Sequence, residues 1–196
     1  MTQIYKSDLV DLFRSDDEQI CELTIFVENG KVHVAGSKEI EVANFLSENG
    51  VEELIKTFNR GLDNRLMRAT DANETSSRSH LLFTIHFESE DYKSPGIKQS
   101  KMTFIDLAGS ERLALIGFDE FLYEEALFIN ESLRCLERVI KLLGLGNHEQ
   151  RIDFEGNLLT HLLLDSLGGS SKSLLMVMIS PSVFDLEATM DTLKFA

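Results

Sequence analysis

The chain has 196 residues, of which 43% are hydrophobic and only two are proline, so it is long enough to form one domain with a sizeable core. The net charge of -14 argues against nucleic acid and anionic membrane surfaces as partners, because both require basic patches, and no apolar run is long enough to span a bilayer. Cys21 and Cys135 lie far apart and match no metal-ligand spacing, so we expect a reduced, cytoplasmic compartment rather than a disulfide or zinc framework.

The first half of the chain predicts a hairpin, a helix and two strands. Residues 21–42 alternate apolar and polar side chains around Glu28-Asn29-Gly30-Lys31, which is typical of a β-hairpin. From residue 51 apolar side chains recur at helical spacing, which predicts a helix that ends near Arg68. Residues 81–87 read as a strand, and a Ser-Pro-Gly turn at residues 94–96 leads to a second strand at 102–105.

The second half predicts helices and one further strand. Apolar residues at steps of three and four predict a long helix over about residues 121–143, which Gly144 ends. A short helix is predicted next, at residues 158–164. The continuous apolar run at 174–179 suits a strand that is covered on both faces, and Asp185 is expected to cap a last helix over residues 185–196.

A strand that runs into an acidic, glycine-bearing turn is where we expect the chemistry. Residues 104–112 read F-I-D-L-A-G-S-E-R. A carboxylate at the carboxyl end of a strand can hold hydrated magnesium, and a glycine three residues later lets a backbone N–H approach a phosphate oxygen without a Cβ in the way. Asp106 and Gly109 have this spacing, which by itself also fits an ordinary loop after a core strand.

A second polar stretch, residues 73–80, reads N-E-T-S-S-R-S-H and directly precedes the strand at 81–87. Taken alone, it is a loop whose Ser and Thr side chains cap the next element of the chain. Together with residues 106–111 it resembles the kinesin motor family, in which N-x-x-S-S-R-S-H is the first nucleotide switch and D-L-A-G-S-E the second. The resemblance continues in the same order at residues 129–133, 166–173, 179–181 and 192–196.

The resemblance implies a role for each residue of the two switches. ATP or ADP with Mg²⁺ would be the ligand. Ser77 and Asp106 would hold the metal, Asp106 through water, and Arg78 would pair with Glu111 to close the gate between the switches. Besides Asp106 and Ser77, the nucleotide-binding residues would be Asn73, Ser76 and Gly109, with the Gly109 N–H directed at the γ-phosphate.

The resemblance also implies the fold and shows what this chain lacks. It predicts one partial kinesin motor domain over residues 1–196, a three-layer α/β/α core with a central, mostly parallel sheet that is incomplete at its N-terminal side. Residues 4–13 resemble a family segment that leaves a central strand and enters a short helix, well inside a motor domain. No G-x-x-x-x-G-K-[ST] loop is present in the sequence, so we expect the chain to be inactive as an ATPase by itself.

The same family would place residues 122–144 and 153–161 against microtubules. The cations available for that contact are Arg134, Arg138, Lys141 and Arg151. Between residues 111 and 165, however, eleven acidic residues stand against five Lys or Arg, a net charge of -6. Because tubulin is also acidic, we expect tubulin to be a weak partner, with another kinesin chain as a further candidate partner.

Three functions remain open on the sequence. The chain can be part of an ATP-driven microtubule motor that works in the cytoplasm on the cytoskeleton, or a degenerate, non-catalytic kinesin-like head that acts as a binding or regulatory module. The third, a switch protein of the small G-protein type, is suggested by Asp106 and Gly109 alone. Residues 76–80 and the absence of an N-K-x-D motif argue against it.

Overall fold

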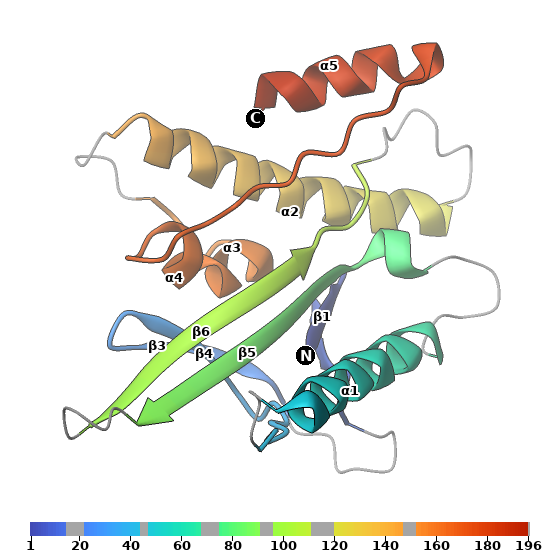
Figure 1. Ribbon diagram of the computed structural model, residues 1–196. Coiled ribbons are helices and arrows are strands. Elements are labelled where there is room, and N and C mark those ends of the chain that lie inside the picture. The colour runs from blue at the N-terminus through green and yellow to red at the C-terminus, as the bar shows by residue number, and fades with distance from the viewer. Residues whose placement is uncertain are drawn as a thin grey trace.

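The computed structural model describes residues 1–14, 22–43, 47–67, 75–90, 96–110, 120–146 and 152–195. Its main sheet has four strands in the order β2-β1-β5-β6, and every neighbouring pair is antiparallel. Strands β5 and β6 lie side by side in Figure 1. The two longest strands, β5 and β6, pair along almost their whole length. The strands of this sheet are β1 (Thr2–Tyr5), β2 (Asp8–Asp11), β5 (His80–Glu90) and β6 (Ile97–Asp106).

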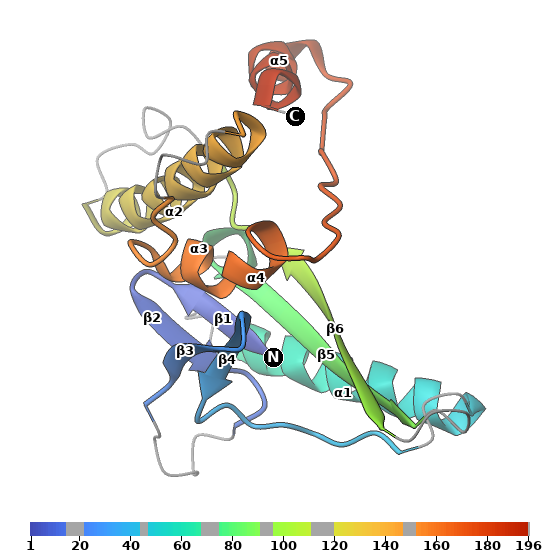
Figure 2. The same cartoon turned by 90° about the vertical axis from the view of Figure 1, so that its left-hand side faces the viewer.

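Helices cover both faces of the sheet, which gives the three-layer α/β/α arrangement that the sequence predicts (Figures 1 and 2). Successive side chains of β5 point to opposite faces. Leu81 and Phe83 pack toward α1, where the Phe58 and Phe83 rings meet edge-on with their centroids 5.0 Å apart. Leu82 points to the other face and packs with Leu136 of α2. The helices of the two layers are α1 (Glu48–Met67), α2 (Glu120–Gly144), α3 (Leu158–Leu162) and α4 (Leu164–Leu167).

The predicted hairpin is confirmed as a separate two-stranded sheet of β3 (Thr24–Glu28) and β4 (Lys31–Ala35). Asn29 and Gly30 both have positive φ, 52° and 74°, which is the backbone that a two-residue hairpin turn requires. The hairpin is fastened to the rest of the chain because the N–H of Val32 donates to the Asp165 carboxylate at 2.9 Å.

Three expectations about strands are wrong for the described residues. The main sheet is antiparallel rather than mostly parallel. Two of its pairs, β1–β2 and β5–β6, are joined by connections too short for the crossover that parallel neighbours need. Residues 4–13 do not pass from a strand into a short helix. The chain turns back after β1 through Lys6, which has φ 53°, and forms β2. Residues 174–179 form no strand, since no described strand lies beside them to complete a ladder.

The two long predicted helices are confirmed. α1 ends at Met67, one residue before the expected end, and α2 ends at Gly144. The predicted helix at 158–164 is divided into α3 and α4 at Leu163, and Asn157 caps α3 by accepting the N–H of Leu159 at 3.0 Å. Asp185 directly precedes the last helix, α5 (Leu186–Phe195). It ends the short helix η3 (Val183–Asp185), whose cap is Ser182.

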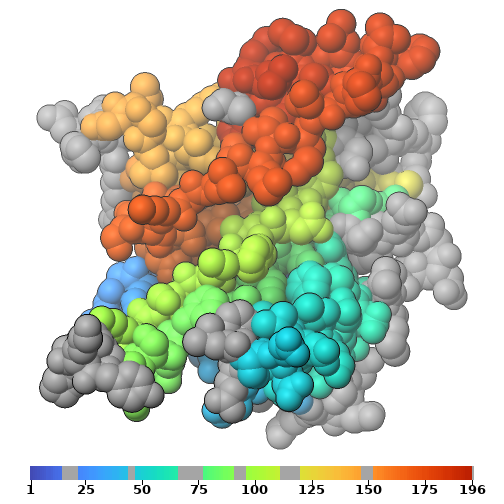
Figure 3. Space-filling model, viewed as in Figure 1, coloured from blue at the N-terminus to red at the C-terminus, as the bar shows by residue number. Residues whose placement is uncertain are grey.

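The free edge of the main sheet and the segment after α4 expose apolar side chains. Phe104 of β6 is 55% exposed, Leu174 is 86% exposed and Met176 is 71% exposed, and α5 contributes no buried residue. Figure 3 shows β6 at the surface between α1 and the segment that leads to α5. An open strand edge beside apolar surface can pair with another chain.

This surface predicts that the isolated chain associates as its concentration rises. The double substitution Leu174→Lys and Met176→Lys should reduce association strongly, because like charges on the exposed segment oppose its pairing with a second chain. Sedimentation velocity over a concentration series is the measurement. Phe184→Lys is the matched control, since Phe184 is 95% exposed but lies on η3. A monomeric chain that melts cooperatively at high concentration would contradict the expectation.

Candidate functional site

The two switch motifs meet at one end of the β5–β6 pair. The helical turn η1 (Thr75–Arg78) immediately precedes β5, and the loop at residues 107–110 immediately follows β6. In the ladder Leu81 pairs with Asp106, so both turns leave the sheet side by side. The N–H of Gly109 donates to the carbonyl oxygen of Ser77 at 2.8 Å. Segments about thirty residues apart in sequence are thereby joined directly.

Asp106, the expected magnesium carboxylate, lies beside a buried arginine of α1. Arg65 is 5% exposed, and its Nη1 lies 3.1 Å from the Asp106 Oδ2. Its Nη2 donates to the carbonyl oxygen of Ser79 at 2.9 Å. The Asp106 side chain remains 66% exposed, so it faces the solvent. The buried Arg65 guanidinium balances its negative charge. Burial of Arg65 is tolerated because its Nη1 and Nη2 groups meet a carboxylate and a carbonyl.

Sequence reasoning missed Arg65, although a signal was present. The apolar stripe that predicts α1 runs through Leu54, Phe58 and Leu62, and Arg65 continues that stripe at the next helical step. A charged residue on the core-facing side of a helix needs a buried partner. The sequence could therefore have flagged Arg65 as a residue with a specific acidic neighbour.

Arg78 pairs with an acid that the sequence analysis did not assign to it. Its Nη1 lies 2.8 Å from the Oε2 of Glu125 on α2, and Glu125 is only 4% exposed. The other carboxylate oxygen of Glu125 accepts a hydrogen bond from the Tyr5 hydroxyl. Burial and the neighbouring Glu125 carboxylate raise the pKa of Tyr5 to about 12, because both disfavour a phenolate. The expected partner of Arg78, Glu111, lies outside the described residues.

His80 connects the second switch to α2 through neutral hydrogen bonds. The N–H of Ala108 donates to Nδ1 of His80 at 3.0 Å, so the proton of the neutral ring sits on Nε2, which lies 2.7 Å from the Ser132 hydroxyl. Ser132 in turn donates to the carbonyl oxygen of Ile129. Burial lowers the pKa of His80 to about 4, which keeps the ring in the form that this chain of bonds requires.

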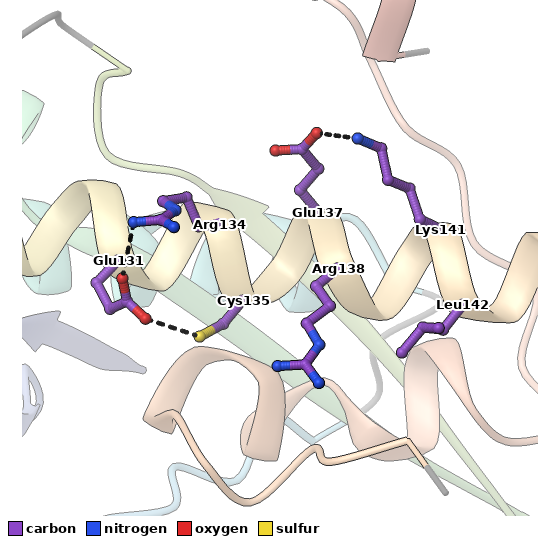
Figure 4. Close-up of a pocket in the computed structure, with 7 residues that line it drawn as sticks. All are labelled: Glu131, Arg134, Cys135, Glu137, Arg138, Lys141 and Leu142. Atoms are coloured by element: carbon purple, nitrogen blue, oxygen red, sulfur yellow. Dashed lines mark hydrogen bonds and ion pairs between the residues drawn. The ribbon is translucent and has the colours of Figure 1, made fainter. Parts of the chain in front are cut away.

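The remaining predicted site residues are only partly described. Asn73, Glu111 and Arg151 lie outside the described residues, and Ser76 is described only by its place in η1. Arg134, Arg138 and Lys141 lie on α2, around an open pocket of about 470 Å³ (Figure 4).

Two of these α2 cations are paired with acids one turn earlier on the same helix. The Nη1 of Arg134 lies 3.5 Å from the Oε2 of Glu131, and Lys141 pairs with Glu137 (Figure 4). For Arg138, no ion pair with an acid is found among the residues that the structure describes. Acids on the same helix therefore neutralise two of these three α2 cations.

The oxygen groups at the two switches fit part of a magnesium shell. Mg²⁺ prefers oxygen ligands and usually retains several waters, with only one or two protein carboxylates. Asp106 presents one exposed carboxylate, and Ser77, whose carbonyl accepts the Gly109 N–H, carries a hydroxyl group. Across the described ranges, no three His, Cys, Asp or Glu side chains are grouped so that they could hold a metal. A magnesium ion here would thus depend on water and phosphate oxygens for its other ligands.

The layered fold and the two joined motifs define a motor domain of the kinesin class. The kinesin motor domain family matches residues 1–196, and the chain therefore belongs to this family. Among curated relatives, it is 36% identical over 197 residues to the kinesin-like protein klpA of Emericella nidulans, covering 99% of this chain and 25% of that protein. It is also 36% identical over 200 residues to the kinesin-like protein KAR3 of Saccharomyces cerevisiae, covering 99% of this chain and 27% of that protein.

Solved motor domains have the same fold. The motor domain of KAR3 from Saccharomyces cerevisiae superposes with a TM-score of 0.76 at 32% identity, covering 99% of this chain and 56% of that one. The C-terminal motor and motor homology domain of Kar3Vik1 superposes with a TM-score of 0.79 at 32% identity. This match covers 99% of this chain and 48% of that one. The chain thus spans about half of the solved motor chains and about a quarter of the two curated relatives named above. In the described residues no helix is long and apolar enough to cross a membrane.

The low pKa of His80 predicts a loss of stability in mild acid. Unfolded His80 takes up a proton near pH 6.5 but folded His80 only near pH 4, so the free energy of unfolding should fall between these values, by up to about 3 kcal/mol. Urea unfolding at several pH values is the measurement. The loss should shrink more in His80→Gln than in His86→Gln, because burial lowers the pKa of both histidines but His80 is buried and His86 is exposed. Equal pH dependence in His80→Gln and the unmodified chain would contradict this.

Proposed function

We propose that this chain forms the switch-bearing part of a nucleotide-dependent microtubule motor domain, whose complete parent couples ATP hydrolysis to movement along microtubules. The observation that carries the proposal is the bond from the Gly109 N–H to the Ser77 carbonyl, which joins two intact switch motifs in a chain of the kinesin motor domain family. The function implies a cytoplasmic location on the cytoskeleton.

Each switch residue has a proposed task toward Mg·ATP, which when bound supplies the phosphoryl group and the metal. Asp106, through water, and Ser77 would hold the metal, because Mg²⁺ prefers oxygen ligands. The Gly109 N–H, which donates to the Ser77 carbonyl in the structure, would donate to a phosphate oxygen of the bound nucleotide. The other residues assigned to the nucleotide or to closing the gate between the switches are Asn73, Ser76, Arg78 and Glu111.

A second candidate function is supported by how far the chain satisfies its own polar groups. Asp106 is paired with Arg65, the Gly109 N–H with Ser77, and Arg78 with Glu125. Nucleotide must compete with these contacts, and the sequence has no Walker loop to strengthen its binding. Such a chain suits a degenerate, non-catalytic kinesin-like head. The similarity to Kar3Vik1, which combines a motor and a motor homology domain, supports another kinesin chain as its partner.

We expect the isolated chain to show no microtubule-stimulated ATP hydrolysis, because loss of the phosphate cradle removes ground-state and transition-state binding together. Phosphate release with and without microtubules is the measurement. The matched control is Asp106→Ala, which separates turnover by this chain from that of a contaminating enzyme. Turnover at a motor-like rate that disappears in Asp106→Ala would contradict the expectation and favour an active enzyme.

The proposed track-binding face carries acidic groups that tubulin should repel. Glu131 is paired with Arg134 at 3.5 Å, and both side chains are exposed. Glu155 lies exposed in the turn that precedes α3. Binding to an acidic lattice depends on positive groups at the docking face, and the paired cations of α2 contribute little to it.

Microtubule affinity should therefore be weak and should fall little with added salt, because salt screens attraction between opposite charges and this face has few unpaired cations to attract tubulin. Reversing Glu131 and Glu155 to lysine should strengthen binding by about fivefold or more. Co-sedimentation across a salt series is the measurement, with Glu52→Lys on α1 as a matched exposed control. Tight, strongly salt-sensitive binding by the unmodified chain would show that the docking face lies elsewhere.

A further inference from the structure

Glu125 is a buried carboxylate that joins three separate segments of the chain. It lies in the second turn of α2 and is 4% exposed. One of its oxygens accepts from the Tyr5 hydroxyl at the end of β1, and the other lies 2.8 Å from Nη1 of Arg78 in η1. The helix, the sheet and the first switch turn thus converge on a single side chain.

Because Glu125 is buried, its carboxylate depends on the two partners that it has in the structure. A carboxylate out of water is stable only while its oxygens are paired, so Glu125 cannot release Arg78 without a large penalty unless water or another donor replaces it. The neighbouring Glu124 has a different environment, because its side chain is 60% exposed and lies 3.8 Å from Lys6 at the surface. Two adjacent acids on one helix therefore differ in how strongly they constrain the chain.

A second buried polar residue of α2, Ser132, joins the same face of the helix to the other switch turn. Ser132 lies seven residues after Glu125, which is about two helical turns, so both residues face the sheet. Ser132 receives the connection from Ala108 through His80, whereas Glu125 receives Arg78. Each switch turn is therefore fastened to α2 at its own buried polar residue. The cations Arg134, Arg138 and Lys141 lie further along the same helix.

We infer that Glu125 is a positioning residue that holds Arg78 to α2 and so couples the first switch turn to the helix that carries the proposed track-binding cations. The inference rests on the proposed function for the role of Arg78 toward nucleotide. The coupling itself is a property of the folded chain. It must be reciprocal, so that loosening either partner loosens the segment that carries the other.

Hydrogen exchange of the full chain without nucleotide tests the inference. In Glu125→Gln, amides of residues 75–78 should exchange about tenfold faster, while the β5–β6 ladder stays within about twofold of the unmodified chain. In Arg78→Ala, amides of residues 120–129 should accelerate in return. The double variant should add little to either single effect. Glu124→Gln is the matched control and should change neither segment.

Two further variants keep the result interpretable if Glu125→Gln folds poorly. Tyr5→Phe removes one hydrogen bond but leaves Arg78 paired, so residues 75–78 should stay protected. Exchanging the charges, Arg78→Glu with Glu125→Arg, should restore protection that either single reversal removes. Unchanged exchange at residues 75–78 in Glu125→Gln, or independent effects in the double variant, would overturn the inference. Because no nucleotide or microtubule is present, failure of the proposed function would leave this outcome unaffected.

Discussion

The antiparallel ladder between β5 and β6 is the constraint on which the site depends. It runs from Leu81 opposite Asp106 to Glu90 opposite Ile97. A slip of one residue would move every side chain to the other face, and the packing of Leu81 and Leu82 into different helical layers opposes such a slip. The register therefore fixes where β5 begins and β6 ends, and the two switch turns meet there.

The polar groups around this junction bond mainly to one another. α1 supplies the cation for Asp106, α2 supplies the anion for Arg78, and β5 supplies the neutral imidazole that accepts the Ala108 N–H. Buried groups of this kind stabilise one arrangement because each unpaired member would cost free energy. The same contacts hold residues 75–78 and 107–110 in one arrangement through groups of the chain itself.

Local sequence signals predicted the hairpin and the two long helices of the fold. The Asn29-Gly30 turn has a backbone that few other residue pairs adopt, and the apolar period of residues 121–143 continues through six turns, so both elements were predictable. Residues 174–179 were not, because a strand needs neighbours and an apolar run does not say whether they are present. The contacts of Arg65 and Glu125 were missed because their partners lie 41 and 47 residues away in sequence, although the helical position of Arg65 indicated that it needs a buried partner.

Native-state amide exchange at Gly109 and Ala108, followed residue by residue with NMR, tests the central claim most directly. If the two switch turns are joined without nucleotide, both amides should be protected nearly as well as the adjoining ladder, since they donate to Ser77 and His80. Exchange of both amides at the rate of an unstructured peptide, with the β5–β6 ladder intact, would contradict the claim that this chain holds its switches together through its own contacts.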